Sequence, residues 1–126
     1  MEDFVRIVAL IGHGPEWVAG RSVYEQGPAI NSHLNAMRAR YDEGALLLGG
    51  PFERGGGIAV LDVPDEATGR ALMDADPAVQ AGVMVYELHR MRAYFDAFTG
   101  YRTPDTVESL GSDRSVDLAA EQIEAG

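Results

Sequence analysis

Residues 45–63 read ALLLGGPFERGGGIAVLDV, and this stretch settles the topology of the chain. Its two apolar runs, 45–50 and 56–63, have the length and composition of β-strands. The link PFERG between them is rich in turn residues and has the length of a hairpin connection. The stretch therefore predicts two antiparallel strands that are neighbours in the middle of the chain.

A helix is predicted on each side of this hairpin, because apolar residues recur there with helical spacing. The first helix covers about residues 24–43, and the second runs from residue 64 to about 75, opened by a proline and two acids. The apolar stripe of the first helix is Ile30, Leu34, Met37 and Tyr41. The expected inward stripe of the second is Ala67, Ala71, Leu72 and Ala75.

Two more strand-like runs complete the pattern, FVRIVALIG at 4–12 and VMVYELHRM at 83–91. The predicted order is β-α-β-β-α-β, which is typical of an α+β protein with a ferredoxin-like sandwich. In such a sandwich both helices cover one face of an antiparallel sheet. The other face should then alternate with polar residues if it meets water.

The second face of the predicted sheet nevertheless looks apolar. The strand at 56–63 places Ile58 and Val60 on one side, while Ala59, Leu61 and Val63 lie on the other. Because the two helices of one chain can cover only one face, we expect the other to be covered by a second copy. The sequence thus predicts a homodimer.

Composition narrows the possible functions. The 126 residues suit one domain, and twenty acidic against ten basic residues give a net charge of -10, which disfavours nucleic acid and anionic membranes as partners. There is no cysteine and no apolar run long enough to cross a bilayer, and the acidic start Met1-Glu2-Asp3 is unlike a secretory leader. We expect a cytoplasmic protein. The folded domain should span 1–103, and an acidic tail should follow at 104–126. The composition of this tail is equally compatible with a last helix and with a frayed end.

The chain shows no phosphate-binding loop, dinucleotide fingerprint or histidine pair at metal-ligand spacing, so no cofactor or metal is expected. Of its three histidines, His13 and His89 read as exposed residues near strand ends, and His33 borders the stripe of the first helix. Asp76 directly precedes Pro77 and could simply cap a short turn. Together, however, a carboxylate and an imidazole make an acid–base group, because the carboxylate fixes the tautomer of the ring.

Four segments in order carry a resemblance to a known family: HLNAM (33–37), GALLLGGPF (44–52), GGGIAVLDV (55–63) and DADPAVQAGVMVYEL (74–88). With this order and spacing the chain resembles the YCII-related family. The resemblance implies a ferredoxin-like fold that pairs into a dimeric α+β barrel, with His33 and Asp76 as a catalytic His-Asp dyad in a small cleft. It also implies that Gly50, Pro51 and Phe52 wall the cleft and that Arg21 binds substrate there.

The resemblance favours a cofactor-free enzyme, a lyase of the dehydrochlorinase type or an isomerase, in which His33 moves a proton on a small ring compound. A non-catalytic module that binds a small ligand or a partner is the alternative. A cofactor-free monooxygenase of the same barrel architecture is a further one, and would need an electron-rich phenolic substrate.

Overall fold

In the computed structural model of the protein, residues 4–98 are described. The chain divides into two units, Met1–Arg92 and Ala93–Gly126, and every helix and strand of the described residues lies in the first. The domain boundary predicted after residue 103, the acidic tail at 104–126 and the helix considered for its end lie outside the described residues.

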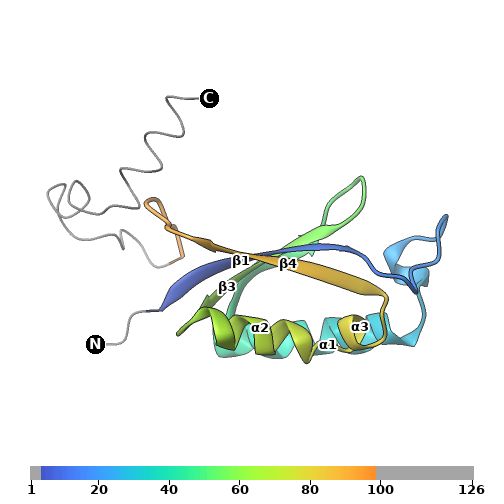
Figure 1. Ribbon diagram of the computed structural model, residues 1–126, viewed down its shortest axis with the longest axis horizontal. Coiled ribbons are helices and arrows are strands. Elements are labelled where there is room, and N and C mark those ends of the chain that lie inside the picture. Colours follow the sequence, from blue (N-terminus) through green and yellow to red (C-terminus); the bar gives the residue numbers. More distant parts are fainter. Residues whose placement is uncertain (1–3, 99–126) are drawn as a thin grey trace, which may run out of the picture. The chain divides into compact units, whose positions relative to one another are not determined.

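The described elements follow the predicted order, with one short helix added. They are β1 (Val5–His13), the 3-10 turn η1 (Val23–Glu25), α1 (Pro28–Glu43), β2 (Leu46–Pro51), β3 (Gly57–Val63), α2 (Glu66–Asp74), α3 (Pro77–Gln80) and β4 (Met84–Met91). The strands form one antiparallel sheet in the order β2-β3-β1-β4. The helices lie on one face of this sheet (Figure 1). The α+β, ferredoxin-like fold class is confirmed.

The first helix begins later than its periodicity suggests. Gly27 has φ of 100°, a value that helical residues do not adopt, so the chain turns there and α1 starts at Pro28. The residues before it form only the 3-10 turn η1. At the other end Gly44, with φ of 88°, is the left-handed C-cap that terminates α1.

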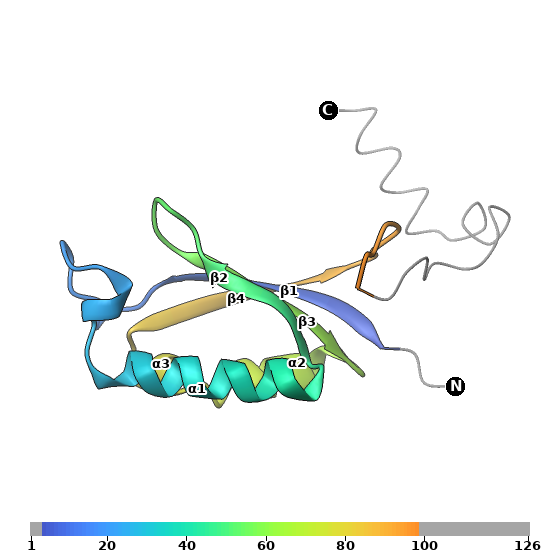
Figure 2. The ribbon, with the colours of Figure 1, turned by 180° about the vertical axis from the view of Figure 1, so that it is seen from behind.

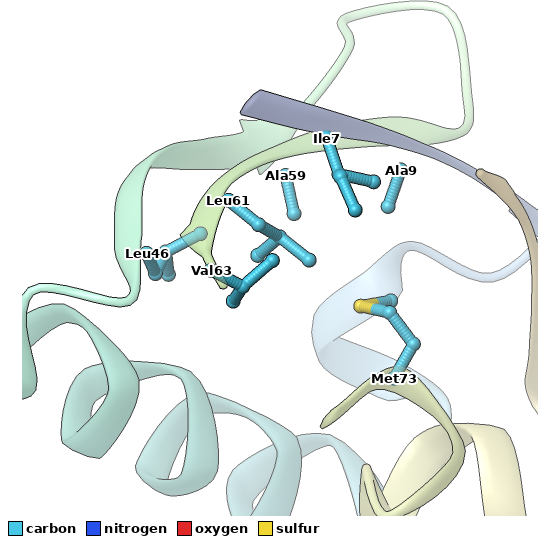
Figure 3. Packing of buried hydrophobic residues seen from close by; sticks show 7 residues of the cluster. All are labelled: Ile7, Ala9, Leu46, Ala59, Leu61, Val63 and Met73. Atoms are coloured by element: carbon cyan, nitrogen blue, oxygen red, sulfur yellow. The ribbon is translucent and has the colours of Figure 1, made fainter. Parts of the chain in front are cut away.

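The main core lies between the sheet and α2. Side chains of alternate strand residues point from the sheet towards the helices, and Met73 of α2 rises to meet them (Figure 3). The cluster consists of Ile7, Ala9, Leu46, Ala59, Leu61, Val63 and Met73. These strand residues also fix which face of each strand is turned towards the helices.

The predicted inward stripe of the second helix was wrong for its alanines. Ala67, Ala71 and Ala75 are exposed, and the buried residues of α2 are Gly69 and Met73. A Cβ atom on Gly69 would lie 3.1 Å from Cδ1 of Ile7, so the glycine lets the helix come close to the sheet. Alanine is too small to orient a helix, whereas burial of the long Met73 side chain stabilises this rotation.

The stripe of the first helix is also rotated from its predicted position. Tyr41 is 61 % exposed and Leu34 is 48 % exposed, whereas His33 and Met37 are half-buried beside the buried Ile30. The inward side of α1 therefore includes the imidazole of His33. None of the helices in the described part of the chain is long and apolar enough to cross a bilayer.

Candidate functional site

A cavity of about 540 Å³ lies between α1 and the sheet. The loop 14–27 and the hairpin loop 52–56 contribute to its wall, and both lie towards the same end of the sheet as α3 (Figure 2). Its inner lining is apolar and includes Ile11, Ile30, Met37, Leu46, Ala59 and Met84. The ionisable side chains on its lining are His13, Arg21, Tyr24, His33 and Glu53.

His33 of α1 and Asp76 meet at the inner side of this cavity. Nδ1 of His33 lies 2.9 Å from both carboxylate oxygens of Asp76. Asp76 is 2 % exposed, and the His33 side chain keeps 13 % of its surface accessible. The imidazole therefore lines the cavity, while the carboxylate lies behind it and outside the lining.

Asp76 also caps the short helix α3. Its Oδ2 accepts hydrogen bonds from the backbone amides of Ala78, at 3.0 Å, and Val79, at 3.4 Å. Its backbone is extended, with φ of -65° and ψ of 131°, because the residue before a proline is driven out of the helical region. The break between α2 and α3 thus turns the carboxylate towards α1, where it serves as both cap and partner of His33.

The position of the carboxylate assigns the tautomer of His33. A carboxylate only accepts hydrogen bonds, so Nδ1 must be the donor in this contact. The proton of the neutral ring then sits on Nδ1, and Nε2 carries a free lone pair. Within residues 4–98 the hydrogen bonds of the His33 ring run from Nδ1 to Asp76, and none involves Nε2. A side chain held in this way can take a proton from a ligand in the cavity.

The residues expected around the cleft are also brought to the cavity. Gly50, Pro51 and Phe52 line it from the end of β2, and Arg21 lines it from the loop 14–27. In the described part of the chain, Arg21 has no carboxylate within ion-pair distance. Hydrogen bonds from the backbone and hydroxyl of Ser22 hold the pKa of Glu25 below its usual value, and the charge of Arg21 contributes in the same direction.

His13 reaches the cavity as well, whereas His89 does not. His13 stacks on Trp17 with 3.8 Å between ring centroids and 4° between ring planes. His89 lies on the opposite face of the sheet, where its Nε2 is 2.8 Å from Glu87. The sequence did hold a signal for His13, because it continues the odd-numbered series of β1 to which the core residues Ile7 and Ala9 belong.

Gln26 is a buried residue near the cavity, and no pattern in the sequence indicated a role for it. Its side-chain oxygen accepts from the amide of Val18 at 2.7 Å. Its side-chain nitrogen donates to the carbonyl oxygens of Val18 at 2.9 Å and Arg21 at 3.0 Å, with a longer contact of 3.4 Å to that of Ser22. One amide therefore ties together the loop that carries Arg21.

No three side chains of the types that ligate metals cluster together anywhere in residues 4–98. Comparison with curated proteins finds no match. The sequence model of the YCII-related domain matches residues 7–92, which include every helix and strand described above except the first two residues of β1. The chain belongs to the YCII-related family.

Proposed function

We propose that this protein is a cofactor-free enzyme in which His33 transfers a proton on a small ring compound and Asp76 holds the imidazole in place. The observation that carries the proposal is the contact of 2.9 Å between Nδ1 of His33 and a carboxylate that is 2 % exposed, at the wall of a cavity. Family membership is compatible with this function and supplies no substrate.

The geometry supports acid–base chemistry in two respects. The Asp76 carboxylate is itself held by two backbone amides, so it cannot swing away from the ring. The ring is consequently fixed, and its free nitrogen is on the edge remote from Asp76. A general base needs a fixed lone pair that lies within hydrogen-bond reach of the substrate proton. Nε2 of His33 provides the fixed lone pair.

The proposed reaction is an elimination or an isomerisation. In the elimination, Nε2 of His33 removes a proton from the ring compound, the electrons of the broken bond form a double bond, and a leaving group such as chloride departs with its bonding pair. In the isomerisation, the protonated imidazole returns the proton to a different atom of the same molecule. Neither reaction consumes an oxidant or a reductant.

The cavity suits such a substrate in size and lining. Its volume of about 540 Å³ falls in the range of small-molecule sites, about 300–1,000 Å³. Its apolar inner residues would contact a ring, and its few polar groups would set the orientation of that ring.

The test is a thermal-shift screen with hydroxyquinols, small lactones and phenols, followed by turnover assays on the compounds that bind. We expect His33→Ala to lower turnover by about 10²- to 10⁴-fold, the usual contribution of a general acid–base group. His89→Ala is the matched control, because His89 also contacts a carboxylate but lies on the far face of the sheet. Equal turnover in the two variants would contradict the proposal.

A non-catalytic ligand-binding module is a second candidate, favoured by the mainly apolar lining of the cavity. It predicts that a ring compound binds but does not react. Wild type and His33→Ala should then both show only the uncatalysed rate. Uptake of oxygen during turnover would instead support a cofactor-free monooxygenase.

A further inference from the structure

The imidazole of His13 is held by an aromatic ring instead of by hydrogen bonds. Its face lies parallel to the indole of Trp17 at 3.8 Å, which fixes the plane of the ring. Within residues 4–98 neither of its nitrogens forms a hydrogen bond or an ion pair. An oriented imidazole with both nitrogens available is a group prepared to bind a ligand.

The hairpin loop leaves the free edge of this imidazole open. A methyl group on Gly55 would lie 3.6 Å from Cε1 and 3.7 Å from Nε2 of His13, so any longer side chain built there would cover that edge. Gly55 has φ of 110°, and this conformation strongly favours glycine. The backbone of the hairpin therefore approaches the ring without blocking it.

Exposure divides the cavity into two parts. The inner part contains the buried Ile30, Ala59 and Met84 together with the largely covered His33. The outer part, here called the rim, contains His13, Trp17 and Arg21, of which His13 and Arg21 are exposed. Two of the three rim residues, His13 and Arg21, thus face solvent.

Charge on the cavity lining is balanced, with one arginine and one glutamate, unlike the strongly negative charge of the whole molecule. The chain carries a net charge of -10, yet Arg21 lines the cavity with no ion-pair partner in the described ranges and His13 is next to the same space. The one carboxylate on the lining, Glu53, lies beyond ion-pair distance of Arg21. A guanidinium and an unpartnered imidazole together provide donors that match a carboxylate group.

We infer that His13, Trp17 and Arg21 form a subsite that binds the carboxylate of a planar ring compound, with the ring directed into the apolar inner part towards His33. This inference rests on the proposed function only in taking the cavity as the substrate site. It narrows the substrate class to small planar monoanions. His13 and Arg21 are binding residues in it, and Trp17 fixes the orientation of His13.

The test compares benzoate with benzamide, which has nearly the same shape but no charge, by isothermal titration calorimetry on the full chain. We expect benzoate to bind at least about tenfold more tightly, the effect of one charge-assisted contact. His13→Gln and Arg21→Gln should each weaken benzoate binding by about fivefold or more and leave benzamide unchanged. Trp17 is the only tryptophan of the chain, so its fluorescence should change on binding in wild type.

Two controls separate a local effect from net charge. Arg38→Gln removes one positive charge from the exposed side of α1, and His89→Gln removes an imidazole from the far face of the sheet. Neither should change the ratio of benzoate to benzamide affinity. Equal affinity for the two probes, absence of binding by either, or wild-type benzoate affinity in His13→Gln would overturn the inference.

The outcome for this subsite is distinguishable from the outcome for the proposed function. His33→Ala should keep benzoate affinity within about threefold of wild type, since the inference assigns the carboxylate to His13 and Arg21, while losing turnover. If the wild-type protein binds benzoate and benzamide equally well but turns over its substrate, only the carboxylate subsite is contradicted. Intact turnover in His33→Ala contradicts the proposed reaction alone.

Discussion

Among single residues, Asp76 shows how one side chain can serve two purposes. As a helix cap it binds the amides of Ala78 and Val79, and as a partner of His33 it orients the imidazole. The two interpretations that its sequence context allowed are therefore compatible, because a carboxylate has enough lone pairs for both sets of donors. Separating the two roles requires a variant that keeps the cap and loses the partner.

Asp76→Asn is such a variant. Its amide oxygen can still cap α3, so we expect the free energy of unfolding to fall by no more than about 1 kcal/mol. Its amide nitrogen would be a donor facing Nδ1 of His33, which moves the ring proton to Nε2 and removes the base. Turnover should fall by about 10²- to 10⁴-fold, measured with the best substrate of the screen.

Asp65→Asn is the matched control for this prediction. Asp65 caps α2 through the amide of Thr68 at 2.8 Å, but it is exposed and has no histidine partner. Its replacement should leave turnover at the wild-type level. If Asp76→Asn also keeps full turnover, the carboxylate is a structural cap and has no role in proton transfer.

Among the elements, the loop 14–27 is the part whose shape depends on one buried side chain. It has no regular structure except η1, and it supplies Trp17 and Arg21 to the cavity. The amide of Gln26 forms hydrogen bonds with backbone groups of Val18 and Arg21 in this loop. A loop held by one amide should be sensitive to the chemistry of that amide.

Gln26→Glu tests this dependence with almost no change of shape. The new carboxylate would face the carbonyl oxygens of Val18 and Arg21, to which the glutamine nitrogen donates. Because a carboxylate cannot donate, we expect a loss of about 1–3 kcal/mol in the free energy of unfolding, measured by urea denaturation. Gln80→Glu makes the same chemical change at an exposed site and should cost much less. Similar losses in both variants would show that Gln26 does not hold the loop.

The cap of α2 predicts a dependence of stability on pH. Hydrogen bonds from the hydroxyl and amide of Thr68 lower the pKa of Asp65 below its usual value. A lowered pKa in the folded state means that the charged cap stabilises the fold above the pKa of the unfolded chain, about 3.9, and that this contribution disappears as the pH falls through the lower folded value. The difference in melting temperature between wild type and Asp65→Asn should therefore be largest near neutral pH and shrink towards pH 2. A difference in melting temperature that stays constant from pH 7 to pH 2 would contradict a role of the charged cap in stability.

In the whole molecule, the face of the sheet opposite the helices is mainly apolar, although it also carries Arg6, Asp62, Glu87 and His89. Among the described residues no helix covers it (Figure 1), and Leu10 and Leu48 are 40 % and 53 % exposed. Its apolar residues are Val8, Leu10, Leu48, Ile58, Val60, Val85 and Met91. We propose that this face pairs with the same face of a second copy, as the resemblance to dimeric α+β barrels implies.

Light scattering on the size-exclusion peak tests the dimer, which should have a mass of about 27 kDa, twice the 13.6 kDa of one chain. Leu10→Asp places a charge on the proposed interface and should shift the mass towards 13.6 kDa with little effect on the fold. Tyr41→Asp introduces the same charge on the exposed side of α1, and this variant protein should remain dimeric. A monomeric wild type would remove the proposed pairing.

The order of the elements could be predicted because each signal for it is local. Apolar runs of strand length, the helical spacing of Ile30 and Met37, and glycine at the end of α1 act through neighbouring residues along the chain. The β-α-β-β-α-β order followed from these signals. The start of α1 was missed because the helix was extended back from the stripe that begins at Ile30, past Gly27 and Pro28, where the chain turns and the helix begins.

The candidate site is only partly local in origin. Proline after Asp76 was enough to predict a cap, but the contact of Asp76 with His33, 43 positions away, depends on how α1 and α3 pack. The rotation of both helices, the arrival of His13 beside Trp17 and the burial of Gln26 likewise depend on which surfaces meet in space. Periodicity along one chain specifies that a side is apolar, whereas the volumes of facing residues such as Gly69 and Ile7 select the rotation and hence the side chains that line the cavity.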